Sequence, residues 1–338
     1  MNLKNLKQID KSSMYKVYDK WPTLAKNAFS QKFKKINLSE INHIVFAGMG
    51  GSGAIGDVFA AILSKNSIHV SVIKGYELPK TVNSKTLVIT TSISGNTAET
   101  LNVLKSASKK KCKIIAFSSG GEMKKFCEEQ KINHVKISMM HSPRASFSIF
   151  LYSMLNVLYP IMPLEKKDIN ESIQSINKTQ KNISSKNLTK SNQALKIAER
   201  VKGIPIIYYP WGLQASAIRF KNSLQENSKI HVIVEDVIET GHNGITSWEK
   251  KSPVNPIMII GHDDHEKTKQ RWVIMKKYFK DRKISYVEIH SEEGNILTKV
   301  INLIYLLDYA SIYKAILSKT DPTPIESIEF IKKLMKND

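Results

Sequence analysis

The chain has 338 residues, a length that suggests two domains and is ample for a hydrophobic core. Hydrophobic residues make up 41% and charged residues 24% of it, and no apolar run approaches the length of a membrane helix. The net charge of +21 is spread along the chain without a basic tail or a zinc-finger spacing, so no nucleic-acid partner is predicted.

The N-terminus and the cysteines indicate a cytoplasmic protein. Residues 1–14 contain lysines, but the apolar segment of a secretory signal does not follow them. The chain has two cysteines, Cys112 and Cys127, whose spacing fits no metal site. Two inert thiols are the favoured interpretation, and a disulfide is the alternative. We therefore expect a cytoplasmic location, no metal and no membrane partner.

In the first half, short apolar runs alternate with amphipathic stretches, as in α/β proteins. The predicted strands lie at 43–48, 68–73, 86–91, 113–117 and 134–138. The predicted helices lie at 53–64, 97–110, 121–130 and 145–159. This alternation predicts a first doubly wound domain over residues 1–160.

The composition changes at about residue 165. Residues 165–200 are rich in Lys, Asn, Ser and Gln, with Ile at helical spacing, which predicts a connector over 161–200 of one or two exposed amphipathic helices. New strands are predicted at 204–209, 230–235, 256–261 and 284–289, and helices at 212–226, 265–281, 295–318 and 324–336. The predicted fold class is therefore α/β with two doubly wound domains, each a mainly parallel sheet flanked by helices, the second over 201–338.

The glycine-rich motif 48-GMGGSG-53 directly follows the strand predicted at 43–48 and opens a helix. Glycines let the backbone approach a ligand closely, and a helix N-terminus attracts anions. The motif also fits the dinucleotide-binding fingerprint, which requires an acidic residue about 20 positions later. The next strand ends instead at Lys74, which disfavours NAD but leaves an NADP enzyme, or a turn without a ligand, as alternatives.

A second polar loop, 91-TSISGNTAET-100, follows the strand at 86–91 and precedes another helix. Its hydroxyl and backbone N–H groups could surround a phosphate, assisted by the helix dipole. One such turn by itself predicts only a helix N-cap. Ligands of open α/β sheets bind at the carboxyl ends of strands, so two donor-rich loops at such ends predict an anion site.

These two motifs resemble the sugar-isomerase (SIS) domain and, in more detail, the bifunctional phosphoglucose/phosphomannose isomerases best represented in archaea. Three further stretches extend the resemblance over nearly the whole chain and in the same order: 142-SPRAS-146, 220-FKNSLQENSKIHV-232 and 321-DPTPIESIEFIKKL-334. The resemblance implies two SIS domains, usually in a homodimer, without a cofactor. It also implies interconversion of glucose 6-phosphate and mannose 6-phosphate with fructose 6-phosphate through a cis-enediol.

The resemblance assigns roles to particular residues. It implies Glu226 as the base and Arg144 as the group that stabilises the enediol. His242, reaching the site from the other subunit, and Lys332 would serve ring opening, and Thr323 would admit both C2 epimers. The substrate-binding residues that it implies are Gly50, Gly51, Ser52, Ser92, Ser94 and Thr97, of which the last three would hold the phosphate.

The chain departs from the family's usual pattern at one position and leaves other functions open. Gly244 follows His242 and Asn243 where the family usually has glutamate, so a carboxylate that could orient the histidine is missing. Read without the resemblance, Glu226 would be a helix-end residue and Lys332 part of a solvated helix face. The alternative functions are an SIS isomerase of another sugar phosphate, a non-catalytic sugar-phosphate sensor and, third, a nicotinamide-dependent enzyme.

Overall fold

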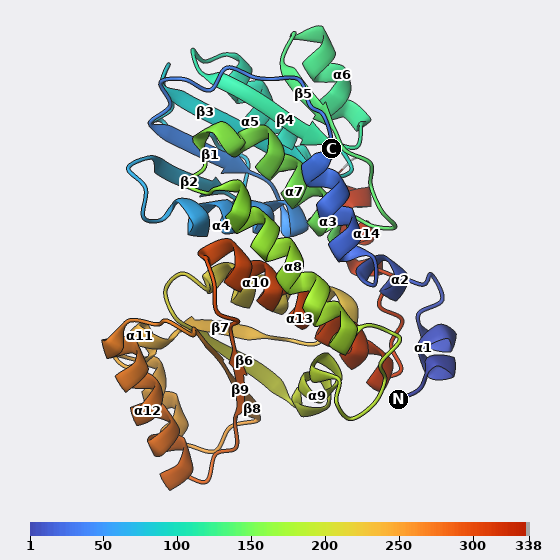
Figure 1. The fold of residues 1–338 in the computed structure, drawn as a ribbon, viewed down its shortest axis with the longest axis vertical. Coiled ribbons are helices and arrows are strands. Elements are labelled where there is room, and N and C mark those ends of the chain that lie inside the picture. Colours follow the sequence, from blue (N-terminus) through green and yellow to red (C-terminus); the bar gives the residue numbers. More distant parts are fainter. Residues whose placement is uncertain (336–338) are drawn as a thin grey trace.

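A computed structural model describes residues 1–335 and contains two separate parallel β-sheets, one above the other in Figure 1. The first sheet has five strands in the order β2-β1-β3-β4-β5, and the second has four in the order β7-β6-β8-β9. The strands are β1 (His43–Ala47), β2 (His69–Ile73), β3 (Thr86–Ser92), β4 (Lys113–Ser118), β5 (Asn133–Lys136), β6 (Ile204–Tyr209), β7 (Ile233–Asp236), β8 (Val254–Ile260) and β9 (Val287–His290). The predicted fold class, two parallel-sheet α/β domains flanked by helices, is confirmed.

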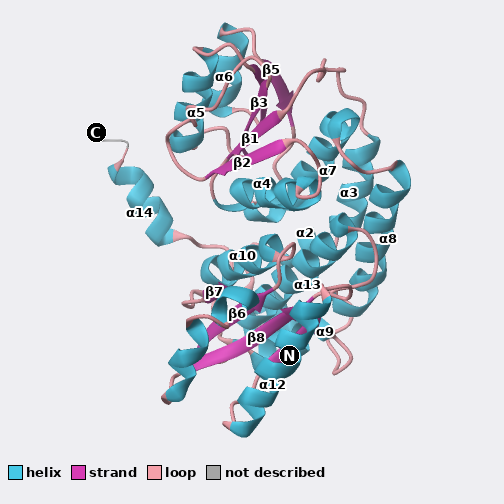
Figure 2. Cartoon of the chain, turned by 90° about the vertical axis from the view of Figure 1, so that its left-hand side faces the viewer, coloured by secondary structure: helices cyan, strands magenta, loops and turns pink. Residues whose placement is uncertain are grey.

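Helices cover both sheets (Figures 1 and 2). The α-helices that precede the second sheet are α1 (Leu3–Ile9), α2 (Tyr15–Tyr18), α3 (Trp21–Ser30), α4 (Gly50–Leu63), α5 (Ala98–Ser108), α6 (Gly121–Glu129), α7 (Phe147–Leu158), α8 (Lys166–Ile183) and α9 (Gln193–Arg200). The later ones are α10 (Gln214–Ser223), α11 (Val237–Thr240), α12 (Glu266–Asp281), α13 (Ile296–Leu317) and α14 (Glu326–Leu334). Short 3-10 turns are η1 (Arg144–Ser146), η2 (Tyr159–Ile161) and η4 (Gly244–Glu249), and η3 (Leu224–Ser228) is a π-helical turn.

The register of the first sheet brings its two polar loops together. β1 lies in parallel between β2 and β3, and Ala47 at its end pairs with Thr90. The loops that follow β1 and β3 therefore leave the same edge of the sheet side by side. All residues of β3 are buried, as expected for a central parallel strand covered on both faces.

The 22-residue helix α13 forms the middle of the molecule. By length and composition it could cross a membrane, but 89% of its apolar 18-residue stretch is buried inside the protein. The helix contains no uninterrupted apolar run of that length, because Asn302 and Asp308 interrupt it, but its mean hydropathy is still high enough for a membrane span. The connector helix α8 covers α13 with a buried face that includes Ile169 and Ile176, so only its other face is exposed.

The N-terminal helices were not predicted from the sequence, because they are short and carry few apolar residues at regular spacing. They nevertheless contribute to the core between the halves. The Trp21 ring stacks at 4.7 Å from Tyr18, 5.5 Å from Tyr305 of α13 and 5.9 Å from Phe147 of α7. Helix α3 therefore ties the helix that leads out of the first sheet to the central helix of the second half.

Two predicted boundaries are wrong near a functional stretch. A single helix is predicted over 212–226. In the structure the α-helix ends at Ser223, and the chain continues as the π-turn η3. Lys229 then adopts a left-handed conformation with φ of 57°, so the next strand starts at Ile233 rather than at 230. The last predicted helix, over 324–336, is found as α14, and residue 336 lies outside the described residues.

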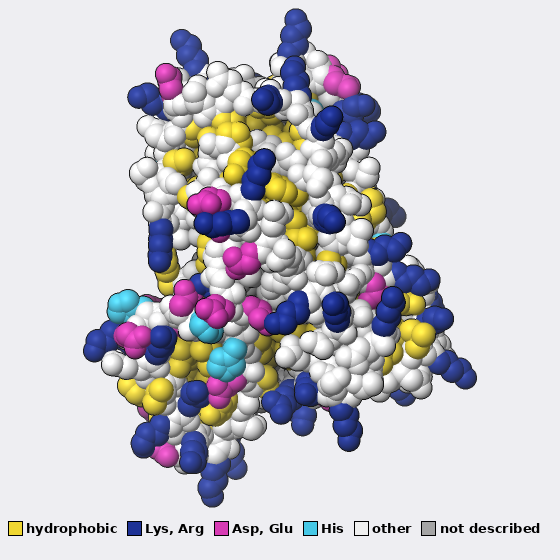
Figure 3. All heavy atoms as spheres, viewed as in Figure 1, with side chains coloured by type: hydrophobic (Ala, Val, Ile, Leu, Met, Phe, Trp, Pro, Cys, Tyr) yellow, Lys and Arg dark blue, Asp and Glu magenta, His cyan; other side chains and the backbone are white. Residues whose placement is uncertain are grey.

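The positive charge is spread over the surface. Figure 3 shows Lys and Arg side chains distributed over both halves of one face, with acidic side chains among them. Pairs such as Lys277–Asp281 at 2.9 Å join neighbouring turns of exposed helices. Each exposed pair of this kind contributes only about 0.2–1 kcal/mol of stability, so such pairs do not determine the fold.

Candidate active site

The first loop at the sheet edge ends in the uncapped N-terminus of α4. Met49 precedes the helix in an extended conformation without a side-chain cap, and Gly50 has a φ of 51°. The first N–H groups of a helix have no partner within it, so those of Gly50 and Gly51 are available to an anion. Lys74 follows β2 and is the residue on which the NADP alternative depends. It donates to Asp57 of α4 at 2.6 Å.

The second loop is tightly organised around the hydroxyl of Ser92. This hydroxyl lies 2.8 Å from the hydroxyl of Thr97 and accepts from the backbone N–H groups of Gly95 at 3.1 Å and Thr97 at 3.4 Å. Ser94 accepts from the N–H of Asn96 at 3.3 Å. Thr97 precedes α5 and makes no side-chain capping bond to it. The predicted phosphate hydroxyls therefore lie in one turn at a second helix N-terminus.

A direct contact joins the two loops into one cradle. The hydroxyl of Ser52 accepts from the backbone N–H of Ile93 at 3.4 Å. Gly48 lies so close to the carbonyl of Thr91 that a Cβ at Gly48 would stand 2.9 Å from that oxygen. Two helix N-termini and several hydroxyl groups therefore face the same region at the carboxyl ends of β1 and β3, which suits a phosphate monoester.

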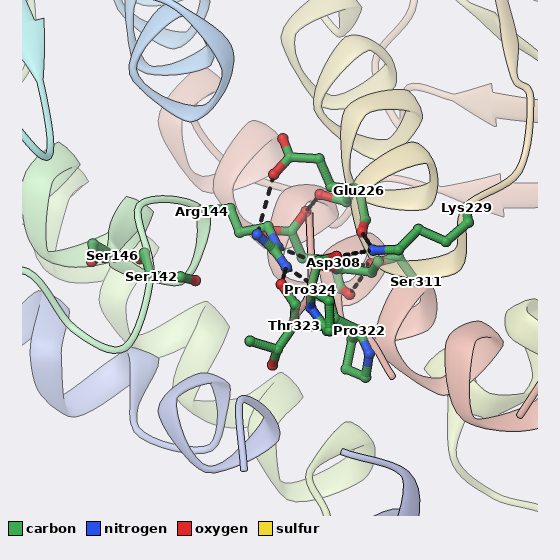
Figure 4. A network of polar contacts seen from close by, with 12 residues as sticks. Ser142, Arg144, Ser146, Glu226, Lys229, Asp308, Ser311, Pro322, Thr323 and Pro324 are labelled. Atoms are coloured by element: carbon green, nitrogen blue, oxygen red, sulfur yellow. Dashed lines mark hydrogen bonds and ion pairs between the residues drawn. The ribbon is translucent and has the colours of Figure 1, made fainter. Parts of the chain in front are cut away.

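Arg144 and Glu226, from different halves of the chain, meet in Figure 4, and the Arg144 Cα lies 3.6 Å from the position of a Cβ on Gly51 of the cradle. Arg144 is buried in η1, and its Nη1 lies 3.4 Å from Glu226 Oε2. Its Nε donates to Asn227 Oδ1 at 2.8 Å, and its Nη2 donates to the carbonyls of Pro322 at 2.6 Å and Thr323 at 2.9 Å. These bonds leave Nη1 as the part of the guanidinium that faces the carboxylate.

Glu226 lies in the π-turn η3, and 23% of its side chain is exposed. Single π-turns of this kind are rare and occur frequently at functional sites. Lys229, at the end of the turn, donates to the Glu226 carbonyl and, at 2.5 Å, to the Pro324 carbonyl. Burial and the nearby Arg144 charge lower the pKa of Lys229. A reachable carboxylate beside a fixed guanidinium can take up and return a proton.

Sequence reasoning missed two residues of this site, Asn227 and Lys229. Both lie in the stretch 220–232 on which the resemblance partly rests, and both are neighbours of Glu226. A polar residue next to a proposed base was the available signal. Their contacts depend on the π-turn, which the sequence pattern did not predict.

Two predicted residues lie away from the Arg144–Glu226 pair within one chain. His242 is exposed in the loop between α11 and η4, where its backbone N–H donates to the Glu239 carbonyl at 2.9 Å. Lys332 lies on α14, whose side chains are all exposed and which projects from the body in Figure 2. Thr323 is at the site, with its Oγ1 buried and without a partner among residues 1–335.

The carboxylate of another residue lies beside Gly244, the position at which the chain departs from the usual family pattern. A Cβ built on Gly244 would overlap Oε1 of Glu235 from β7, so the Glu235 side chain fills the space beside this backbone. Burial, followed by the charge of Glu239, raises the pKa of Glu235. Among residues 1–335, no group of three His, Cys, Asp or Glu side chains is arranged to hold a metal ion.

The two parallel sheets and the hydroxyl-lined loops at one strand edge define a protein built from SIS domains. Residues 37–159 match the family described as SIS domain, and residues 190–335 match the bacterial phospho-glucose isomerase C-terminal SIS domain. In a solved structure, a hypothetical protein from Thermus thermophilus shares the fold with a TM-score of 0.71. It is 12% identical, over 98% of this chain and 89% of that one.

Sequence comparison places the chain more narrowly. A bifunctional phosphoglucose/phosphomannose isomerase from Caldicellulosiruptor bescii is 31% identical over 306 residues, which are 88% of this chain and 90% of that protein. The protein of the same name from Aquifex aeolicus is 28% identical over 89% of this chain and 92% of its own length. The chain belongs to the bifunctional phosphoglucose/phosphomannose isomerase family, as its resemblance to that family implied.

Proposed function

We propose that the protein is an isomerase that interconverts glucose 6-phosphate and mannose 6-phosphate with fructose 6-phosphate. The observation that carries this proposal is the pairing of Glu226 with Arg144, at 3.4 Å, next to a cradle suited to a phosphate. Membership of the family supports the choice of substrates.

In the proposed reaction, Glu226 removes the proton from C2 of the open-chain aldose. The C2–H electron pair forms the C1–C2 double bond, and the C1 carbonyl oxygen takes up a proton, which gives the cis-enediol. The C2 hydroxyl then loses its proton, the electron pair of that O–H bond forms the C2 carbonyl, and the C1–C2 double-bond electrons take up at C1 the proton held by Glu226. Nη1 of Arg144 faces the negative charge that develops on the oxygens, an effect commonly worth about 3–4 kcal/mol of the barrier.

The cradle would hold the phosphate at the other end of the substrate. Ser92, Ser94 and Thr97 supply hydroxyl groups, and Gly50, Gly51 and Ser52 form the first turn of α4. Thr323, whose hydroxyl is buried beside Arg144, is the proposed site of tolerance for both C2 epimers. Because glucose and mannose 6-phosphates give the same enediol, one base serves both substrates.

Ring opening would require a second subunit. We propose a homodimer in which His242 of one chain protonates the ring oxygen of a substrate bound to the other. The exposed position of His242 supports this arrangement, and so does the apolar surface of α14, where Phe330 is 64% and Ile331 56% exposed. Lys332, on the same helix, is proposed to assist once the partner subunit covers the apolar surface of α14 in the dimer.

The activity is tested by supplying fructose 6-phosphate to the purified protein and measuring both aldose phosphates. We expect both products and a fall in kcat of about 10²- to 10⁴-fold in Glu226→Gln. Glu266→Gln, which changes an exposed carboxylate of α12, is the matched control and should retain full activity. Sugar-phosphate binding without either product would refute the proposal and favour the sensor.

The shared site is tested by mixing two inactive variants, Glu226→Gln and His242→Ala. In a symmetric dimer, half of the random pairs are mixed, and each mixed pair contains one intact site. Recovery of about a quarter of the wild-type activity is therefore expected. No recovery after verified subunit exchange, or a monomer at assay concentration, would refute a site shared between subunits.

The remaining organisation follows from the same proposal. We propose residues 1–160 as the N-terminal SIS domain, 161–200 as the connector and 201–338 as the C-terminal SIS domain, in line with the separate sheets. A cytoplasmic location is supported by Cys112 and Cys127, which are both free thiols, as is usual for reducing compartments.

A further inference from the structure

A fully buried ion pair within the second half of the molecule lies against the segments of the first half that carry the proposed site. Arg219 of α10 and Asp308 of α13 have side chains that are 2% and 0% exposed. Arg219 Nε lies 3.1 Å from both Asp308 oxygens, its Nη2 donates to Oδ2 at 2.7 Å, and Ser223 donates to Oδ1 at 2.5 Å. Burying two charges costs several kcal/mol, so the pair by itself is no evidence of added stability.

The other contacts of Arg219 are with segments of the first half that carry the site. Its Nη2 donates to the backbone carbonyl of Arg144 at 2.8 Å, and its guanidinium carbon lies 4.7 Å from the centre of the Phe147 ring. Its Nη1 would stand 3.2 Å from a Cβ at Gly51, so it lies against the first turn of α4. Arg219 therefore touches both the main chain of Arg144 and the cradle.

A second chain of hydrogen bonds from α13 reaches the other end of Arg144. Ser311 lies one helical turn after Asp308 and donates to the Asp308 carbonyl at 2.6 Å. Its hydroxyl accepts from Asn227 Nδ2 at 2.8 Å, and Asn227 Oδ1 accepts from Arg144 Nε. Arg144 is thus held from α13 at its backbone, through Arg219, and at its guanidinium, through Asn227 (Figure 4 shows the Arg144 end).

We propose that Arg219 and Asp308 are positioning residues for the isomerase reaction. They fix the backbone of Arg144 and the Gly51 turn relative to the Glu226 turn, so that base, guanidinium and phosphate cradle keep their spacing across the two halves. This role rests on the proposed function. Lysine could not take over this role, because it lacks the planar fork with which Arg219 serves Asp308 and the Arg144 carbonyl together.

The direct test is Arg219→Lys, which keeps the charge and removes the fork. Misplacing catalytic groups by about an ångström can cost on the order of 100-fold in rate, so we expect kcat to fall about 10- to 100-fold. The KM for fructose 6-phosphate should change less than about threefold, because the hydrogen bonds that organise the Ser92–Thr97 turn do not involve Arg219 and the turn can still bind the phosphate. Arg282→Lys, at an exposed guanidinium 5.1 Å from the Tyr278 ring, is the matched control.

A purely structural role is separated from positioning by combining variants. If Arg219 acts through Arg144, then Arg219→Lys in an Arg144→Lys background should cost less than about threefold, because residues that act as a unit are non-additive. Losses that multiply in the double variant would overturn the proposal. Should Arg219→Lys fail to fold, Ser223→Ala removes one bond to Asp308 and should show the same pattern at a smaller amplitude.

The two levels of the proposal fail in different ways. Wild-type protein without isomerase activity overturns the proposed function and this inference with it. Active wild-type protein together with an unimpaired, folded Arg219→Lys variant overturns only the positioning role. A lower kcat that tracks the folded fraction measured by circular dichroism also overturns it.

Discussion

Replacing Gly95 by alanine would place a methyl group where the structure already has backbone. Gly95 lies in the second loop of the cradle with a φ of 78°, and a Cβ there would overlap the carbonyl oxygen of Gly120. That carbonyl belongs to the turn before α6, which is itself fixed because the N–H of Glu122 donates to the Asn96 side chain at 3.0 Å. Neither backbone segment can move away without breaking such bonds.

The expected magnitude has two separable parts. A left-handed conformation costs a residue with a Cβ about 1–2 kcal/mol. Gly50→Ala isolates this part, because Gly50 has a φ of 51° and nothing within 4 Å of a Cβ. Gly75→Ala carries neither penalty, since its φ is not left-handed and its surroundings are open. The overlap at Gly95 adds to the conformational part, so we expect a total loss of about 3 kcal/mol or more.

The assay is urea unfolding of the three alanine variants, together with the KM for fructose 6-phosphate. The free energy of unfolding should be unchanged in Gly75→Ala, lower in Gly50→Ala and lowest in Gly95→Ala. Gly95→Ala should also raise KM at least about tenfold, because each 1.4 kcal/mol of lost substrate binding is a factor of ten. Equal stability of the Gly50 and Gly95 variants would refute the overlap, and an unchanged KM would refute the phosphate role of this loop.

Three further predictions concern other parts of the chain. Trp21→Phe removes the bond from its Nε1 to the Ala145 carbonyl at 3.0 Å, and urea unfolding should show a loss of about 1–2 kcal/mol. Burial, then the nearby His69, lowers the pKa of His43 below 6.5, so the unfolded chain binds its proton more readily. Stability, measured as Tm, should therefore fall as the pH drops from about 6.5 to 5. In His43→Gln the Tm should depend less on pH over this range. Burial, then Glu128, raises the pKa of Cys127 to about 11, so native protein at pH 8 should react with a thiol reagent far more slowly than protein in urea.

These three predictions have distinct contrary outcomes. An undiminished free energy of unfolding in Trp21→Phe would show that the indole bond contributes nothing. A Tm slope that is the same in wild type and His43→Gln would assign the acid sensitivity to other groups. Equal labelling rates of Cys127 in native and unfolded protein would contradict its burial. Cys127→Ser identifies the labelling phase of that thiol.

The sequence by itself determined the two sheets and the cradle. Strand periodicity and the glycine and hydroxyl motifs are local properties, and parallel strands place their carboxyl ends at one edge, so both loops were expected at that edge. The pairing of β1 with β3 in the structure makes the two loops neighbours. The family could also be recognised from these motifs and their order. The short N-terminal helices could not be predicted, because tertiary packing rather than a local pattern stabilises them.

Only the tertiary structure decided which polar residues meet at the site. The π-turn that presents Glu226 ends at the left-handed Lys229, and Lys229 and Arg144 both donate to carbonyls of the segment Pro322–Pro324. The pairing of Arg219 with Asp308 joins helices that are far apart in the sequence. A single sequence carries no signal for such contacts, because two residues 89 positions apart become neighbours only after the helices that carry them have packed together.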